Sequence, residues 1–454
     1  MNFWFLKRPV HISWQIALLA GGIVVGVIAS QTTGWFASVV WLFVGSGLAA
    51  VGMWRGKIYA LPFLLCGGII LGLWRGGIVQ VNLAPYANIE GATVEILGTV
   101  SDDPEVDKHG MLALHVAAKK VNEHSLEGKL WVSTHEKRDI KRSDEVVIKG
   151  KIEPGFGSFA ASIFRAEIIE VRRPVPGDIM MQVRDSFAEA IRRVIPDPEA
   201  SLGIGYLLGQ RRALPPELDD ALKIVGLTHI VVASGYNLTI LVRFTRRLFA
   251  RISKYLAMLA AGGTTIGFVL MTGFSPSMSR AGLVTGLSLL AWYYGRKFHP
   301  IILLSFVAAL TLLINPTFGW NDLGWQLSFL AFAGVMIVAP LLHAYFFGDK
   351  KPGTIRQIMG ETIAAQIMTF PILVAAFGVF SNIAVVANLL VLPFVPLAML
   401  LVFCSGLAVI LAPPLAPFMA ALAQFVLGYM VGVVQHLANL PWAQAAFTLS
   451  PFAV

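Results

Sequence analysis

Charged residues are scarce in this chain, and acidic residues are missing from long parts of it. Lys, Arg, Asp and Glu make up 13% of the 454 residues, whereas soluble domains carry about 25%. No Asp or Glu occurs between Asp220 and Asp322, and no Asp, Glu, Lys or Arg follows Glu361. Because 56% of the residues are hydrophobic, this scarcity excludes a soluble globular protein and predicts a polytopic membrane protein.

Sequence patterns that would indicate enzyme or motor chemistry are also absent. The two cysteines, Cys66 and Cys404, lie in apolar runs, so they predict neither a disulfide framework nor a metal site. The nine histidines form no HExxH pattern, and no GxxxxGK[ST] phosphate-binding loop occurs. We therefore expect no catalytic residues, no metal, no cofactor and no nucleotide-driven motor in this chain.

Apolar runs long enough to cross a bilayer follow one another along most of the chain. A helix needs about 20 apolar residues to span the hydrocarbon core, and about eleven such runs occur. The fold class that we expect is a polytopic α-helical membrane protein with an inserted extracytoplasmic β domain. The predicted spans lie near residues 11–30, 34–53, 58–81, 229–249, 255–273, 279–295, 299–315, 323–344, 357–379, 382–411 and 413–438.

Basic residues beside the predicted spans indicate one orientation in the membrane. Basic loops favour the cytoplasmic side, and basic residues at 7–8 precede the first span while those at 55–57 follow the second. The basic clusters at 243–254, 296–297 and 350–356 fall on the same side under this count. We therefore expect a multi-pass protein of the bacterial inner membrane, with a cytoplasmic N-terminus and the polar region after the third span outside.

The polar region at 83–175 has the pattern of a small β domain. Five short runs of alternating hydrophobic residues predict an OB-like barrel, with Trp131 and Phe164 in its core. Many such barrels bind single-stranded nucleic acid through basic and aromatic residues, although here 15 acidic residues outnumber 13 basic ones. The candidate contacts, in and beside an exposed loop, are Lys149, Lys151, Phe156 and Phe159.

Amphipathic segments follow the β domain at 176–228. In DIMMQVRDSFAEAIRRVI, Ile179, Val183 and Phe187 share one helical face, and Arg184 lies away from it. This pattern suits a helix that lies in the membrane interface. It also suits a helix that packs on the β domain.

Four sequence blocks in the second half of the chain carry a family resemblance. They read GLTHIVVASGYN, TGFSPSMSRA, NDLGWQLSFLA and AAQIMTFPILVAAFGVFSNIAVVANLLVLP, and they fall roughly between residues 200 and 400. Their order and spacing resemble those of the ComEC family of competence proteins. One position departs from the family pattern, because Asn237 stands where the second signature His is expected. This position can therefore neither titrate nor hold a metal as a His would.

The resemblance implies a function and a set of partners. ComEC-type proteins are inner-membrane channels that import single-stranded DNA during natural transformation, so we expect single-stranded DNA and membrane lipid as partners. Family members often end in a metallo-β-lactamase-like domain, and this chain resembles the form without it. A separate DNA receptor, a nuclease and a cytoplasmic motor would then complete the uptake machinery.

Polar residues inside or near the later spans are the candidate walls of such a channel, because polar groups in hydrocarbon need a reason to be there. Structural explanations compete with this one. An ion pair between Asp322 and Arg280 would lock two helices, and Gln366 and Asn388 would link helices by hydrogen bonds. The candidate residues of the DNA path are Arg211, Arg212, His229, Ser234, Gly235, Asn237, Arg280, Asp322, Gln326, Gln366 and Asn388.

Two other functions fit parts of the same pattern. Broken helices with polar residues also describe a secondary transporter of a small polar solute, although no inverted repeat is visible. An intramembrane hydrolase would use Ser234 or Asp322, although the sequence identifies no paired base. The domain organisation that we expect is a three-span region at 1–82, the OB-like domain at 83–175, amphipathic helices at 176–228 and the channel domain at 229–454.

The orientation can be tested with reporter fusions. A reporter that is active only in the cytoplasm should give no signal when it is fused after Leu83, and a strong signal when it is fused after Lys351, because the basic loops face the cytoplasm. Immunoblots should confirm that both fusions accumulate equally. Activity after Leu83 without activity after Lys351 would reverse the proposed orientation.

Overall fold

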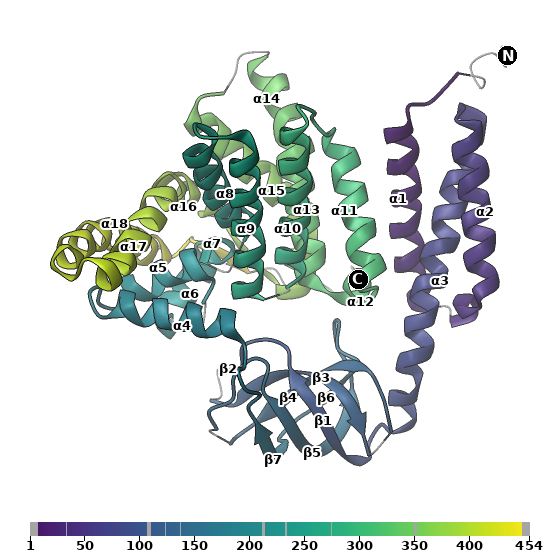
Figure 1. Ribbon diagram of the computed structural model, residues 1–454, viewed down its shortest axis with the longest axis horizontal. Coiled ribbons are helices and arrows are strands. Elements are labelled where there is room, and N and C mark those ends of the chain that lie inside the picture. Colours follow the sequence, from purple (N-terminus) through teal and green to yellow (C-terminus); the bar gives the residue numbers. More distant parts are fainter. Residues whose placement is uncertain are drawn as a thin grey trace. The chain divides into compact units, whose positions relative to one another are not determined.

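The computed structural model describes residues 8–32, 34–106, 110–122, 124–136, 138–210, 214–231, 234–273, 275–348 and 352–446 (Figure 1). The chain divides into two compact units. The first combines Met1–Ile179 with Ile301–Gln326, and the second combines Met180–Pro300 with Leu327–Val454. A helical segment from the later part of the chain therefore packs with the N-terminal helices.

Apolar helices make up the membrane part of the first unit. Short 3-10 turns at Ser30–Thr32, Gly34–Ala37 and Ile58–Ala60 connect the first three of them. The helices are α1 (Ile12–Ala29), α2 (Val39–Arg55), α3 (Leu61–Asn88), α11 (Pro300–Ile314) and α12 (Thr317–Asn321).

Glycines let α1 and α3 approach each other closely. Gly22 and Gly26 lie one turn apart on α1, and Gly68 and Gly72 lie one turn apart on α3. A Cβ atom at Gly22 would lie 2.6 Å from the carbonyl oxygen of Leu65, and one at Gly26 would collide with the carbonyl of Ile69. Small residues at this spacing allow backbone contact between membrane helices, where apolar burial from water cannot drive association. The glycines therefore set the distance between the two helices.

Arg75 and Trp320 attach α11 and α12 to these helices. The guanidinium of Arg75 on α3 donates to the carbonyl oxygens of Leu313 at 2.8 Å and Ile314 at 3.1 Å. The last carbonyls of a helix have no partner within the helix, so Arg75 caps the C-terminal end of α11. The indole of Trp320 donates to the carbonyl of Val27 at 2.9 Å. Both bonds satisfy polar groups that lipid would leave unpaired.

Seven strands, which follow α3 and precede α4 along the chain, form a closed barrel (Figure 1). The order around it is β1-β3-β4-β6-β5, with β5 pairing back onto β1, β7 on β5 and β2 on β3. Strands β4 and β6 are parallel, and all the other pairs are antiparallel. The strands are β1 (Thr93–Val100), β2 (Glu105–Val106), β3 (Leu112–Val121), β4 (Gly128–Thr134), β5 (Glu145–Pro154), β6 (Ala161–Ile163) and β7 (Glu167–Arg172).

The five predicted β runs coincide with strands of the barrel, and the last run is divided between β6 and β7. Arg165 has a φ of 55°, a left-handed conformation that interrupts an extended strand. The predicted core is wrong at two positions. On β4 the side chains of Leu130 and Val132 are fully buried, so alternation turns Trp131 outward. Phe164 follows β6 and is 45% exposed.

The second unit consists of helices around one apolar core. Fully buried side chains from several helices meet there, among them Leu202, Val402 and Leu427. A π-helical turn at Gly334–Val338 follows α13, and 3-10 turns at Leu392–Phe394 and Pro413–Leu415 precede α17 and α18. The elements are α4 (Ile179–Arg192), α5 (Glu199–Leu208), α6 (Pro216–Ile224), α7 (Thr228–Val231), α8 (Gly235–Ala250), α9 (Lys254–Thr272), α10 (Pro276–Tyr293), α13 (Leu323–Ala333), α14 (Ala339–Phe347), α15 (Thr354–Phe377), β8 (Val379–Ser381), α16 (Ala384–Val391), α17 (Val395–Leu411), α18 (Ala416–Ala438) and β9 (Gln444–Ala446).

Helix α4 leaves two of its expected apolar residues on the protein surface and buries an arginine, and its place in the membrane interface stays a prediction. Ile179 and Val183, expected on the apolar side, are both more than half exposed, whereas Arg184 is 4% exposed. Ala188 and Ile191 join the helical core of the second unit. Arg184 can be buried because its guanidinium pairs with the neighbouring Asp185 at 3.0 Å and also donates to a backbone carbonyl. The lost hydration of the cation is thereby offset.

Seven helical segments within the described residues are long and apolar enough to cross a membrane. Each of the eleven predicted runs coincides with one or more helices, but α2 and α11 are shorter apolar helices, and α8 and α10 fall outside this set. The chain is thus a helical, multi-pass membrane protein, and the count of eleven stays a prediction. The seven segments are Ile12–Thr32, Ile58–Asn88, Lys254–Thr272, Leu323–Phe347, Thr354–Phe377, Ala384–Leu411 and Pro413–Ala438.

The glycine contact between α1 and α3 should be sensitive to a single side chain. Gly26→Leu should destabilise the protein by about 2 kcal/mol or more, because the new side chain must displace the backbone of α3. The neighbouring Gly21 has no atom within 4 Å of its Cβ position, so Gly21→Leu provides a matched control. Thermal unfolding of the purified full chain in detergent would measure both. Equal melting temperatures for the two variants would contradict the close contact.

Candidate nucleic-acid interface and polar groups of the membrane helices

Aromatic rings gather on the outer surface of the barrel. His115 on β3 and Trp131 on β4 are cross-strand partners, and their ring centroids lie 5.0 Å apart. Phe159 lies 4.9 Å from the ring of His115 and 5.5 Å from that of Trp131. Phe156 lies 5.5 Å from both Trp131 and Phe159. These four rings form one continuous group, called here the ring cluster.

The loop between β5 and β6 places two members of the ring cluster. Gly155 begins it, and a Cβ atom there would collide with the carbonyl of Phe159. Gly157 has a φ of 58°, which glycine adopts without steric cost. The two glycines allow the loop to fold back so that Phe156 and Phe159 reach Trp131. Phe156 remains 47% exposed, which leaves part of the ring cluster open to a ligand.

Charged groups lie at one edge of the ring cluster. The carboxylate of Asp102 is 2.8 Å from Nδ1 of His115 and 2.7 Å from Nζ of Lys129. Burial by itself would raise the pKa of Asp102, but the bonds from His115 and Lys129 outweigh it and hold that pKa well below its usual range. The ammonium of Lys129 also lies 5.6 Å from the ring centroid of Phe159. A cation is thus held beside a group of aromatic rings, a combination that also occurs in sites for single-stranded nucleic acid.

The predicted DNA contacts of the barrel divide into two groups. Phe156 and Phe159 belong to the ring cluster, whereas Lys149 and Lys151 are exposed on β5, where they pair with Glu95 and Thr93 of β1. The sequence interpretation did not include His115, Trp131 and Lys129 among the candidate contacts. Alternation along β3 and β4 would have placed these side chains outward. The cross-strand register that pairs His115 with Trp131 is visible only in the structure.

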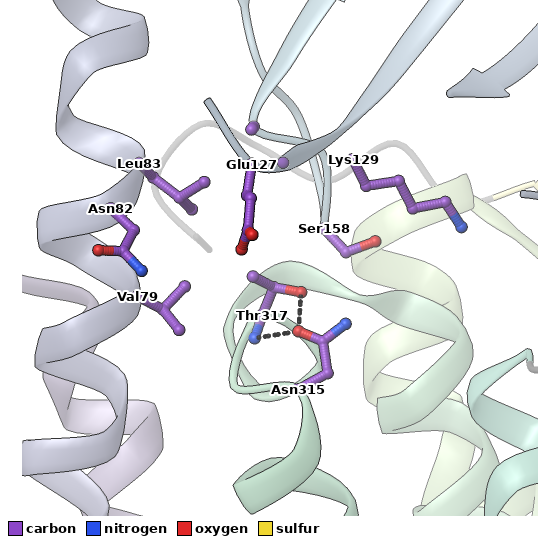
Figure 2. A pocket seen from close by; sticks show the side chains of 10 residues that line it. Val79, Asn82, Leu83, Glu127, Lys129, Ser158, Asn315 and Thr317 are labelled. Atoms are coloured by element: carbon purple, nitrogen blue, oxygen red, sulfur yellow. Dashed lines mark hydrogen bonds between the residues drawn. The ribbon is translucent and has the colours of Figure 1, made fainter. Parts of the chain in front are cut away.

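A pocket of about 170 Å³ with both polar and apolar lining residues includes Lys129 within the first unit. Figure 2 shows Asn82 of α3, Ser158 of the loop, Asn315 after α11 and Thr317 at the start of α12 around it. The amide oxygen of Asn315 accepts bonds from the backbone and hydroxyl of Thr317 at 3.2 and 2.7 Å. The pocket is therefore bounded by the barrel and by residues of α3 and of the region where α11 ends and α12 begins.

The signature segment of the second unit forms a break between two helices. Helix α7 ends at Val231, and α8 begins at Gly235 with Ser234 as its cap. The amide of Asn237, which is fully buried, donates to the carbonyl of Ile230 at 2.9 Å. Its Oδ1 is buried without a partner among the described residues. The amide of Asn237 therefore links the start of α8 to α7, while its Oδ1 accepts no hydrogen bond from the described residues.

Arg280 lies in the second turn of α10 and stacks on aromatic rings. Its guanidinium carbon is 5.0 Å from the ring centroid of Phe332 and 6.0 Å from that of Phe329. The hydroxyls of Ser277 and Ser328 are 3.2 Å apart and link α10 to α13. Asp322 belongs to the other unit, where it caps α13 by accepting from the backbone N–H of Trp325 at 2.8 Å. The ion pair between Asp322 and Arg280 stays a prediction.

The other predicted path residues are dispersed. Gln326 donates to the carbonyl of Trp320 at 3.3 Å, and Gln366 donates to that of Ser381 at 3.5 Å, so both satisfy nearby backbone. Asn388 on α16 is 3% exposed, and its Oδ1 has no partner within the described chain. His229 is exposed, with Nδ1 3.0 Å from the carbonyl of Gly226. Two further predicted residues, Arg211 and Arg212, lie outside the described residues.

The ion pairs of Asp102 predict a pH-dependent contribution to stability. A carboxylate whose folded pKa is depressed stabilises the fold above its unfolded pKa, near 4, and loses that effect as the pH falls through the folded value. Asp102→Asn should therefore destabilise the protein by about 1 kcal/mol at pH 7 and by less below pH 4. Differential scanning fluorimetry of the purified full chain at pH 7 and pH 3 would measure this. The same difference at both pH values would exclude the ionised pair.

The second half of the chain is similar to known proteins. The Competence protein family model matches residues 206–454, slightly more than half of the chain. An uncharacterized protein of Aquifex aeolicus (strain VF5) is 24% identical over 245 residues, which cover 54% of this chain and 51% of that protein. The ComE operon protein 3 of Bacillus subtilis (strain 168) is 26% identical over 221 residues, 47% of this chain and 27% of that protein.

The chain thus spans about half the length of the first relative and about a quarter of the second. No solved structure matches it significantly. The matched region begins within α5 and includes the signature break, Arg280, Gln366 and Asn388. Because the family model covers more than half of its residues, the chain belongs to the competence protein family.

Proposed function

We propose that this protein takes part in DNA uptake during natural transformation, as an inner-membrane channel that conducts single-stranded DNA into the cytoplasm. Membership of the competence protein family carries this proposal. The seven apolar segments supply a membrane-embedded body. We propose no enzymatic reaction for the chain. A strand receptor, a nuclease and a motor would be separate proteins.

The barrel is proposed to be an OB-like domain that meets the strand outside the membrane. Its strand order, with the final run paired to both β4 and β5, is that expected of a five-stranded Greek-key barrel. In OB folds the second and third strands and the loops beside them hold oligonucleotides. The ring cluster occupies β3, β4 and the loop before β6, which correspond to those positions. Bases would stack on the rings while Lys129 faces phosphate.

The path through the second unit is proposed to pass the signature break. Ser234, Gly235 and Asn237 stand at the start of α8, and Arg280, Gln366 and Asn388 supply polar groups on other helices. A strand must keep its phosphates solvated or paired throughout the membrane, because an unpaired charge there costs several kcal/mol. We extend the proposed path to Arg211, Arg212, His229, Asp322 and Gln326, and we retain the eleven spans, the extracytoplasmic barrel and the domain boundaries at 82, 175 and 228 as parts of the proposal.

Removal of the largest ring from the ring cluster should impair DNA capture. Trp131→Ala should weaken binding of a fluorescent dT20 strand to the full chain in nanodiscs about tenfold, because stacking contributes about 1–3 kcal/mol per base. Transformation frequency should fall with it. Phe164→Ala is the control, since that ring is exposed outside the ring cluster.

Deletion of the gene in a transformable host gives the transformation frequency without this protein, against which the variants are compared. Deletion should abolish transformation by chromosomal DNA, and a plasmid copy of the wild-type gene should restore it. Undiminished transformation in the deletion strain would refute a role in DNA uptake. Wild-type behaviour of Trp131→Ala in a strain that depends on the gene would instead refute the role of the ring cluster alone.

A further inference from the structure

Arg280 has a guanidinium without a polar partner in the described part of the second unit. Its Nε is buried and forms no hydrogen bond with the described residues, and the residue as a whole is partly buried. Its described neighbours include the faces of Phe329 and Phe332. Rings attract a cation, but they do not satisfy its five N–H donors. By contrast, Arg184 in the same unit pairs with Asp185 and a backbone carbonyl.

The N-terminus of α8 lies beside this guanidinium. A Cβ atom at Gly235, the first residue of α8, would lie 3.5 Å from Nη2 of Arg280 and 3.3 Å from Cβ of Ala281. The N–H groups in the first turn of a helix have no acceptor within that helix. Ser234 accepts the N–H of Asn237 at 3.4 Å, which leaves Gly235 and Tyr236 as the first two donors. Glycine therefore keeps the space between Arg280 and the helix end open.

Helix α10 adds a second positive end. Ser275 caps it by accepting the N–H of Met278 at 3.2 Å, and Arg280 follows in the next turn. Each helix N-terminus carries roughly half a positive charge. Two such ends and one full cation repel one another in a medium of low dielectric constant. The sequence has no Asp or Glu between Asp220 and Asp322. Glu361 on α15 acts on Tyr236 at the start of α8, but its carboxylate bonds to Gln357, so the described residues give Arg280 no ion pair. The positive end therefore favours an anion.

We propose that Arg280 and the N-terminus of α8 form a binding site for one phosphate of the translocating strand. The proposal rests on the proposed function, since it names the group of the DNA that this part of the path holds. The two free oxygens of a phosphodiester share one negative charge, so they can accept from a guanidinium fork on one side and from the helix N–H groups on the other. The site suits the backbone of the strand, because one anion can accept from both the guanidinium and the helix N–H groups.

The strength of the site follows from its composition. A single arginine supplies the full charge, and the remaining donors are backbone N–H groups. Sites that bind phosphate tightly use several cationic side chains. With one arginine, this site binds each phosphate weakly, so the strand can move on and bring the next phosphate into the site. The absence of a side chain at Gly235 is a requirement, because a methyl group there fills the position between the two sets of donors.

The first test measures how strand binding depends on salt. Binding of fluorescent dT20 to the full chain in nanodiscs of neutral lipid is measured at several salt concentrations. Loss of one phosphate contact lowers the slope of log K against log salt by about 0.7 for a single strand. Arg280→Gln should show this decrease and bind about tenfold more weakly at low salt, whereas Arg280→Lys should keep the slope. A dT20 strand with a methylphosphonate backbone should not distinguish wild type from Arg280→Gln.

Matched glycine variants test the geometry of the site. Gly235→Ala should weaken dT20 binding severalfold while Arg280 stays in place. Gly286→Ala on α10 is the control, because no atom lies within 4 Å of its Cβ position. A purely structural role for Arg280 on the phenylalanine rings would lower the melting temperature and leave the salt slope unchanged, and that result would overturn the proposal.

Two outcomes separate this inference from the proposed function. If wild-type protein binds dT20 and supports transformation but Arg280→Gln has the same salt slope, the phosphate site is refuted and the DNA role stands. If dT20 does not bind at all, tripolyphosphate serves as the probe, and Arg280-dependent binding supports the anion site without the DNA role. Restoration of transformation by combining Arg280→Asp with Asp322→Arg, when each alone abolishes it, would make Asp322 the partner and overturn the proposal.

Discussion

Every polar group inside the helical parts of this protein has to find a partner, because lipid and apolar side chains offer none. Most of the described groups do. Arg75 caps the carbonyls that end α11, Trp325 donates to the hydroxyl of Thr311 at 3.0 Å, and Arg184 pairs with Asp185. Among the described buried groups without a partner, which also include Trp74, Tyr86, His343 and Ser381, Arg280 carries a full charge, and the oxygens of Asn237 and Asn388 lie on helices of the same unit. In a bilayer such exceptions point to a ligand or to water.

Under the proposed function, the two units would hold the strand by different chemistry. The barrel offers rings with a cation beside them, which suits bases whatever their identity. The second unit offers a guanidinium and helix N–H groups, which suit phosphate. Neither surface distinguishes one base from another. Each offers one cationic side chain, Lys129 or Arg280, which is too little charge to bind a strand irreversibly. A conduit for arbitrary DNA needs both properties, since selective or tight contact would stop movement.

Sequence patterns predicted the elements of this fold far better than their contacts. Apolar length and strand alternation depend on local sequence alone, so helices and barrel strands lie where the runs predicted them. The outward direction of Trp131 was missed because its large side chain suggested burial. Its neighbours Leu130 and Val132 are buried, so alternation along β4 turns Trp131 outward. The burial of Arg184 on α4 was not predicted, because it depends on Asp185 and on a distant carbonyl as partners. Pairing between distant residues leaves no periodic signal.

The replacement of a signature His by Asn237 has a physical consequence for the path. Its amide donates to the carbonyl of Ile230 and so satisfies backbone at the break between α7 and α8. A neutral imidazole donates one bond as well, but a histidine in this position also acquires charge as the pH falls. Asparagine stays neutral at every pH, with a donor and an acceptor on one rigid group. Under the proposed function, Asn237 therefore adds no titratable group at the start of α8, and the guanidinium of Arg280 faces the proposed phosphate position there.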